Sequence, residues 1–232
     1  MKKLLISILI VVSLIATITN ADEIREERAE YYISLLGFRI GYMVLASKTK
    51  GNLYAATSLV GSTGVGNFFG KMKFKARIRG RIEGKNVIPT HYHLESTKDG
   101  VTTTKTLTFK DGNVIQDEGT RQSDSGIDYL SGFFVVMRDT LEEELCGFSY
   151  TLADEQRVAE VIIGNPVRLR SGKYKCYSEY VRKSGYSEDE MSKPSFKFEL
   201  YYEPSPKVAN YYQLQKMILH SRFGRMRVLR SN

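Results

Sequence analysis

Most of the chain after Asp22 alternates apolar with polar residues, in runs rich in Val, Ile, Thr, Tyr and Phe. This two-residue period is typical of half-buried strands, because successive side chains point to opposite faces. Turn signals such as Gly51-Asn52 and Asp99-Gly100 separate the runs. The pattern predicts strands at 29–36, 38–49, 53–59, 71–83, 87–96, 101–109, 114–118, 147–152, 157–169, 174–184, 196–202, 212–221 and 225–230.

One segment has the period of a helix instead. Its apolar residues recur every three or four positions, which defines a stripe on a helix and not on a strand. The stripe consists of Leu130, Phe133, Phe134, Met137, Leu141 and Leu145. Ser125 or Asp128 can cap the start of this helix and Gly147 can end it. Such a helix commonly plugs or flanks an open sheet, and the polar stretch 184–194 is predicted to be a mobile loop.

These elements predict an all-β fold with one helix. The strands are spaced about 8 to 14 residues apart, which fits a meandering barrel or sandwich. We expect an antiparallel barrel-like or strongly curved sheet of roughly 10 to 13 strands. No shift in composition marks a domain boundary, so residues 22–232 form a single predicted domain.

The N-terminus has the pattern of a secretory leader. Met1-Lys2-Lys3 precedes an apolar run from Leu4 to Ile18, and Thr19-Asn20-Ala21 supplies small residues before a cut. We predict a signal peptide over residues 1–21 and a periplasmic product. A retained anchor is the competing interpretation, but a run of about 15 residues is short for a span of roughly 20. No later run is long enough, so we expect no membrane-spanning segment after cleavage.

Export changes the interpretation of charge. The chain of 232 residues has a formal charge of +8, and loss of Lys2 and Lys3 with the leader lowers it to +6. Part of the excess positive charge therefore belongs to the predicted leader. A basic surface suits an anionic partner, but net charge alone does not identify a fold or a reaction. Nucleic acid does not suit an exported protein, and the sequence contains no aromatic nucleic-acid-binding motif.

Cys146 and Cys176 are the two cysteines of the chain. In an oxidising compartment, with no third cysteine to compete, they are most simply a disulfide. Two separately buried thiols are the alternative, because sequence does not test the geometry that a bridge requires.

The sharpest local pattern is a basic stripe from residue 71 to residue 81. Its six cations occupy alternate positions while apolar residues occupy most of the others. They are Lys71, Lys73, Lys75, Arg77, Arg79 and Arg81. The stripe is either a surface for an anionic envelope partner or a solvated outer face that discourages edge-to-edge aggregation.

The next predicted strand brings two histidines to the same face. A three-residue loop at Gly84-Lys85-Asn86 would pair Arg79 with His91, Arg77 with His93 and Lys75 with Glu95. A His-x-His pair can bind zinc, but the neighbouring Arg and Lys side chains repel a cation and only His220 remains as a third imidazole. We therefore predict no metal site and no cofactor.

Catalytic motifs are weak throughout. The segment Gly61 to Lys71 superficially resembles a phosphate loop, but its glycine spacing fails and Met72 replaces the hydroxyl residue. A flexible loop with an apolar tip at Phe68-Phe69 is the better interpretation. No Gly-x-Ser-x-Gly elbow occurs, and either cysteine would have to escape bridging to act as a nucleophile. We therefore expect a non-enzymatic protein.

Several short motifs occur in a fixed order along the chain. They are the opening strand Tyr32 to Gly41, the helix start Asp128-Tyr129-Leu130-Ser131, the succession Cys146, Asp154-Glu155-Gln156-Arg157, Cys176, and the closing Pro204, Tyr212 and Phe223-Gly224. This ordered set resembles the exported bacterial family called domain of unknown function 3108. Tyr129 and Glu155 depart from the Pro and Gly usual in that family. The resemblance implies a barrel-like fold in the bacterial envelope, supports the disulfide, and supplies no catalytic residue.

The hypothesis for function is a periplasmic protein that binds a lipid-like or apolar molecule or assists envelope assembly. An interaction module that uses the basic stripe is the alternative, and a hydrolase is a third. Filled and hollow barrels share the same alternation, so sequence does not decide whether a ligand cavity exists.

Overall fold

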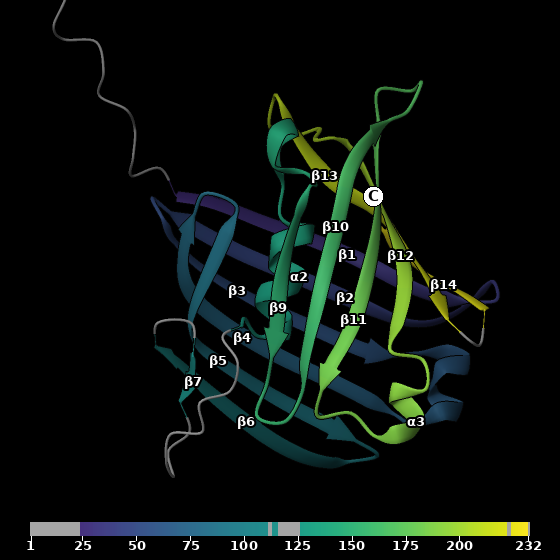
Figure 1. Ribbon diagram of the computed structural model, residues 1–232. Helices are drawn as coiled ribbons and strands as arrows, with labels where there is room; N and C mark the ends of the chain where they lie inside the picture. The colour runs from purple at the N-terminus through teal and green to yellow at the C-terminus, as the bar shows by residue number, and fades with distance from the viewer. Residues whose placement is uncertain (1–23, 111–112, 116–125, 222–223, 232) are drawn as a thin grey trace, which may run out of the picture.

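The computed structural model describes residues 24–110, 113–115, 126–221 and 224–231. Most of these residues belong to one antiparallel sheet that curls into a nearly closed barrel (Figure 1). The strands are β1 (Ile24–Leu35), β2 (Phe38–Lys50), β3 (Leu53–Ser62), β4 (Met72–Glu83), β5 (Asn86–Lys98), β6 (Val101–Lys110), β7 (Asn113–Ile115), β8 (Thr140–Leu141), β9 (Phe148–Ala153), β10 (Val158–Arg168), β11 (Tyr174–Ser184), β12 (Ser195–Pro204), β13 (Tyr211–Ser221) and β14 (Gly224–Arg230).

The strand order is that of two meanders joined by the chain ends. It runs β7-β6-β5-β4-β3-β2-β1-β14-β13-β12-β11-β10-β9, so the first and last strands of the domain are neighbours at the centre. The two ends of this order, β7 and β9, do not pair with each other within the described residues. Every predicted strand corresponds to an observed one, which confirms the predicted fold class.

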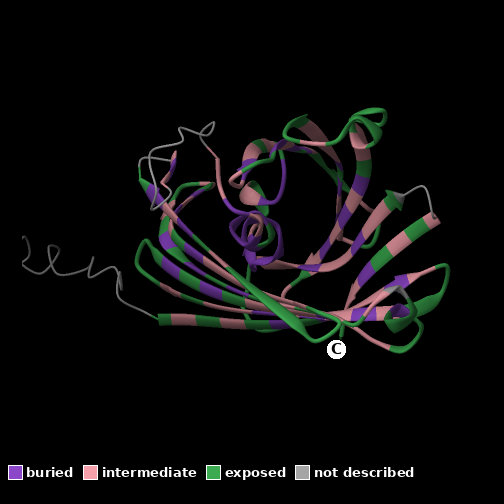
Figure 2. Ribbon diagram, turned by 90° about the horizontal axis from the view of Figure 1, so that it is seen from below, coloured by how far each residue is buried: buried purple, intermediate pink, exposed green. Residues whose placement is uncertain are grey.

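The helix α2 (Tyr129–Met137) lies inside the barrel and contacts both walls, as the view in Figure 2 shows. Phe134 stacks on Tyr54 of β3, with ring centroids 4.7 Å apart. From the opposite wall, the Tyr202 hydroxyl donates to the Val136 carbonyl at 2.9 Å. The expected plug is therefore present, and it fills the middle of the barrel with side chains.

The helix is shorter than its apolar stripe predicts. Asp128 caps its start, because the side chain accepts from the Ser131 amide, but the helix ends at Met137 and not near Gly147. The Asp139 amide donates to the Glu27 carboxylate at 2.9 Å, and Leu141 pairs with Tyr211 as part of β8. These contacts with the barrel replace the next helical turn, and Ser125 lies outside the described residues.

Three short helices complete the described chain. They are the 3-10 helices η2 (Gly64–Phe69) and η3 (Glu142–Glu144) and the single turn α3 (Glu188–Met191). Segment 184–194, predicted as a loop, therefore contains α3, which a Ser187–Glu190 capping box stabilises. The predicted leader over residues 1–21 lies outside the described part of the chain.

The predicted register between β4 and β5 is confirmed, but its predicted cause is wrong. Arg79 pairs with His91, Arg77 with His93 and Lys75 with Glu95. The turn has two residues, because Glu83 pairs with Asn86, and the extra residue is a bulge at Thr90. The Thr90 hydroxyl donates to the Arg79 carbonyl at 3.1 Å. Gly80 permits the bulge, since a Cβ there would lie 2.2 Å from the Ile88 carbonyl oxygen.

Candidate functional site

An apolar hollow of about 560 Å³ lies at one end of the barrel. Its walls are side chains on the inner face of β1, β3, β4 and β14, together with the turn between β1 and β2. The apolar residues that line it are Ile33, Leu35, Leu36, Ile40, Val60, Met72, Phe74 and Met226. This size falls within the range of small-molecule sites, about 300 to 1,000 Å³.

Three glycines, Gly41, Gly61 and Gly66, are among the residues that line this hollow. Gly66 lies so close to β2 that a Cβ would be 1.9 Å from the Ile40 carbonyl oxygen. The Thr63 amide also donates to that carbonyl at 3.0 Å. The 3-10 helix η2 is therefore held against the end of β2 and forms one side of the hollow.

A second, smaller apolar space of about 150 Å³ lies between α2 and the strands β9 to β13. Tyr129, Phe133 and Val136 line it from the helix, and Phe196 and Leu219 are among the residues that line it from the barrel wall. Leu219 pairs directly with Met226 of the larger hollow. The two spaces are therefore neighbours in the sheet, and the barrel is hollow toward this end while α2 fills its middle.

The predicted basic face is present on β4. Lys73, Lys75, Arg77, Arg79 and Arg81 are all exposed, and the residues between them are buried or half-buried. Lys71 precedes the strand, and its amide donates to Asp99 at 2.9 Å. Five of the six predicted cations therefore share one strand face, as alternation requires.

A cationic groove of about 770 Å³ crosses this outer face. Small residues form its floor, and long cationic side chains stand on either side. The floor includes Ala46, Ala55 and Thr57, while Arg28 and Lys48 flank one side and Arg77, Arg79, His91 and His93 the other. Glu26 and Glu27 also line the groove; Lys48 pairs with Glu26 at 2.8 Å, and Arg28 pairs with Glu30 at 2.8 Å. The groove opens outward, because Ala56, Ile78 and Tyr92 point inward from the same strands and are buried.

Part of this cationic charge is already neutralised within the protein. Glu95 lies 3.3 Å from the Lys75 ammonium and 3.9 Å from the Arg77 guanidinium. Arg81 pairs with Glu83 at 3.3 Å. Lys73 and Arg79 make no ion pair with any residue that the structure describes, so they are the cations most available to an external anion.

The two histidines on this face do not form a metal site with other residues. His93 Nδ1 lies 3.0 Å from the Thr106 hydroxyl, and its Nε2 lies 3.9 Å from Glu95. No group of three or more His, Cys, Asp or Glu side chains suited to a metal occurs among the described residues. The third histidine, His220, lies 3.5 Å from Glu199 on β12.

Cys146 and Cys176 form the predicted disulfide. Their Cα atoms are 6.2 Å apart, within the usual range for a bridge, and both residues are buried. Cys146 follows η3, and Cys176 lies within β11. The bridge therefore fastens the segment after α2 to the barrel wall.

A buried chain of polar groups lies at the start of α2. Asp128 accepts from the Ser131 amide at 2.8 Å and from its hydroxyl at 2.6 Å. The Ser131 hydroxyl in turn lies 3.1 Å from the Tyr54 hydroxyl. Burial raises the pKa of Asp128 to about 6, although the hydrogen bonds from Ser131 lower it. The group resembles a catalytic relay in composition, but its members satisfy each other and cap a helix.

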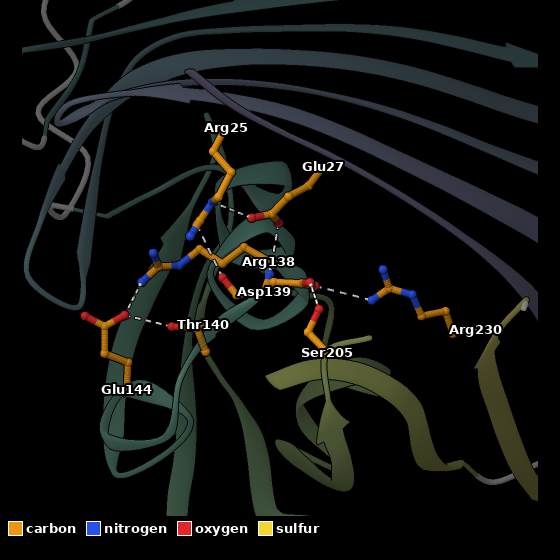
Figure 3. A network of polar contacts seen from close by, with 8 residues as sticks. All are labelled: Arg25, Glu27, Arg138, Asp139, Thr140, Glu144, Ser205 and Arg230. Carbon is orange, nitrogen blue, oxygen red and sulfur yellow. Dashed lines mark hydrogen bonds and ion pairs between the residues drawn. The ribbon is translucent and has the colours of Figure 1, made fainter. Parts of the chain in front are cut away.

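A polar network at the other end of α2 joins four parts of the chain (Figure 3). Arg25 and Glu27 come from β1, Arg138 and Asp139 follow α2, Ser205 precedes β13, and Arg230 ends β14. Asp139 accepts from Ser205 at 2.8 Å and lies 3.5 Å from Arg230. Burial raises the pKa of Glu27 and lowers that of Arg138, since it disfavours the charged form of each.

In a comparison with solved structures, the chain is similar to the β-barrel-like protein of domain of unknown function DUF1849 from Brucella abortus. The TM-score is 0.50 at 10% sequence identity, over 88% of this chain and 95% of that chain. No family model and no curated protein matches this sequence. The likeness shows a shared β-barrel-like fold of unknown function, and it does not show membership of the family 3108.

The hollow is the feature that sequence reasoning missed. Its lining residues are ordinary apolar positions of alternating strands, and nothing in their pattern separates them from the packed positions around α2. The three glycines near β2 and β3 are the signal that could have drawn attention to this end of the barrel.

No helix within the described residues is long and apolar enough to span a bilayer.

Proposed function

We propose that this chain is an exported, non-enzymatic periplasmic protein that binds the apolar part of a lipid-like molecule in the hollow at the barrel end. The observation that carries the proposal is the hollow itself, about 560 Å³ in volume with a lining that is almost entirely apolar. Water inside such a space finds few polar partners, so an apolar ligand that displaces it is favoured.

Other features support this proposal. The adjoining space beside α2 extends the apolar surface beyond the hollow, which suits an elongated ligand such as an acyl chain. The leader sequence and the disulfide both suit an exported protein. The ordered motifs shared with domain of unknown function 3108 favour a place in the bacterial envelope, where lipid-like molecules are abundant.

A non-enzymatic role is part of the same proposal. The polar groups that most resemble a catalytic set, Asp128, Ser131 and Tyr54, are occupied with one another beneath the barrel wall. The hollow itself offers a hydroxyl only at Ser62, which donates to the Asn67 side chain at 2.7 Å. This arrangement suits binding, because nothing in the lining is placed to move a proton.

A larger side chain in the hollow should weaken binding without unfolding the barrel. In Met226→Trp the larger side chain enters the apolar space, and we expect affinity for a fluorescent long-chain fatty acid to fall about ten-fold or more. Titration of the purified protein with this probe measures the effect. Leu53→Trp is the matched control, because Leu53 is exposed and lies outside the hollow. Equal probe binding by wild type and both variants would contradict the proposal.

The cationic groove supports a second candidate function, the binding of an anionic envelope component. Arg77→Glu with Arg79→Glu reverses two charges of the groove, so affinity for a polyphosphate probe should fall about ten-fold or more and lose most of its salt dependence. Arg168→Glu with Arg170→Glu makes the same charge change at exposed positions outside the groove. If both pairs weaken binding equally, only net charge matters and the groove is not a site.

A further inference from the structure

The four most exposed large apolar side chains of the described residues lie on turns at one end of the barrel. They are Phe68 at 89% exposure, Leu36 at 70%, Val101 at 69% and Phe38 at 65%. Leu36 and Phe38 belong to the turn between β1 and β2, Phe68 to η2, and Val101 to the first position of β6. Single exposed apolar residues are ordinary, but four at one end form a feature that requires a partner.

Hydrogen bonds and close contacts place these turns together. The Thr63 amide binds the Ile40 carbonyl, which holds η2 beside β2. The Asp99 amide donates to the Lys71 carbonyl at 2.9 Å, which fastens the turn before β6 to the segment after η2. In Figure 1 the turn between β1 and β2 and the blue coil of η2 lie at the same end of the barrel as α3.

The apolar hollow lies at the same end of the barrel as these side chains. Leu36 lines the hollow and is also one of the four exposed residues, and Gly66 of η2 lines it beside Phe68. Phe38, Phe68 and Val101 do not line it. These three side chains therefore lie at the same end of the barrel as the hollow but outside its lining.

Cations flank the apolar side chains. Arg39 follows Phe38, Lys71 follows η2, Lys98 lies beside the turn before β6, and Arg225 is the second residue of β14; all four are exposed. The one acid among them, Asp99, accepts a hydrogen bond from the Lys71 amide. Other acidic residues of this end lie on α3, at Glu188, Asp189 and Glu190, and on the turn before β10, at Asp154 and Glu155. The apolar side chains are thus grouped with positive charge on one part of the barrel end.

We infer that this end of the barrel docks on an anionic membrane surface, with Leu36, Phe38, Phe68 and Val101 inserted among the lipids. A bilayer accepts apolar side chains that come from separate turns, and its anionic headgroups attract the flanking cations. The inference rests on the proposed function and deepens it, because docking places the end of the barrel that contains the hollow against the source of a lipid-like ligand.

Co-sedimentation with lipid vesicles tests the docking. Wild-type protein should bind vesicles that contain phosphatidylglycerol and bind pure phosphatidylcholine vesicles more weakly. Phe38→Ser, Phe68→Ser and Val101→Ser together should weaken binding to the anionic vesicles about ten-fold or more. Lys71→Glu with Lys98→Glu should remove the preference for anionic lipid. All proteins are prepared identically with the same N-terminus, so any contribution of residues 1–23 is equal among them.

A control variant carries the same kind of change elsewhere. Leu53→Ser, Val167→Ser and Tyr177→Ser replace three exposed apolar residues outside this end, and should leave vesicle binding within about two-fold of wild type. Equal losses in the two triple variants, or no binding by wild type, would overturn the inference. Because Phe38, Phe68 and Val101 lie outside the hollow, their variant should still bind the fatty-acid probe, so a failure of docking is distinguishable from a failure of ligand binding.

Discussion

Replacing Cys146 and Cys176 with alanine is expected to lower the free energy of unfolding by about 3 to 4 kcal/mol. The bridge closes a loop between cysteines separated by 30 positions in the sequence, and a loop of this length restricts the unfolded chain by about that amount. Both positions are buried, and alanine is a small apolar side chain that introduces no polar group there. The loss is a large part of the stability of a domain, which is commonly about 5 to 15 kcal/mol.

Urea unfolding monitored by circular dichroism measures this loss. Wild-type protein with a reductant should unfold at nearly the same urea concentration as the double alanine variant without one. The reductant should leave the double variant unchanged, which controls for effects unrelated to the bridge. A loss below about 1 kcal/mol would show that the bridge adds little to the other contacts of the segment after α2.

The strands were predictable because the alternation of apolar and polar residues that identifies a strand in the sequence also determines which of its faces is buried. In β4, apolar residues alternate with Lys and Arg, and this alternation decides which face is buried. The face assignment fixes which residues of β4 and β5 can be neighbours, so the pairing of Arg77 with His93 followed from sequence alone. The bulge at Thr90 was not predictable from sequence. A three-residue turn, or a two-residue turn followed by a bulge, gives the same pairing of Arg79 with His91 and of the residues after it.

The early end of α2 shows that contacts with distant strands can override an apolar period in the local sequence. Leu141 and Leu145 continue the apolar period of α2, yet the helix ends before them. Leu145 is still buried, so the period predicted its burial correctly and its conformation wrongly. What ends the helix is a set of contacts with β1, β13 and β14, which are remote in sequence and have no local signature.

The candidate site was predictable only in part, for the same reason. The basic face on β4 is local in sequence and was found. The hollow brings Ile33, Phe74 and Met226 together from three strands that are distant in sequence, and its volume depends on how η2 and the turn between β1 and β2 pack against them. Alternation identifies inward-facing residues, but it carries no information on whether they meet other side chains or an unfilled space.

Replacing Asp139 with alanine is expected to lower the free energy of unfolding by about 3 to 5 kcal/mol, since a buried charge then loses its partner. The Asp139 side chain is 7% exposed and that of Arg230 is 10% exposed, so water replaces the lost contact poorly. Ser205 also loses its acceptor. Glu83→Ala is the control, because the Arg81–Glu83 pair is exposed and should contribute less than about 1 kcal/mol.

A second substitution distinguishes an unpaired buried charge from a general loss of packing. Asp139→Ala combined with Arg230→Met leaves neither charge of the pair, and should recover part of the stability lost in Asp139→Ala alone, because an apolar side chain is cheaper to bury than an unpaired guanidinium. Urea unfolding of the wild type, Asp139→Ala, Glu83→Ala and the double variant gives the free energy of unfolding of each. If the double variant is no more stable than Asp139→Ala, the loss comes from the broken hydrogen bonds of Asp139 and not from the stranded charge of Arg230. Such a result would make the network a set of hydrogen bonds that holds the end of α2 to the barrel, with its ion pairs contributing little.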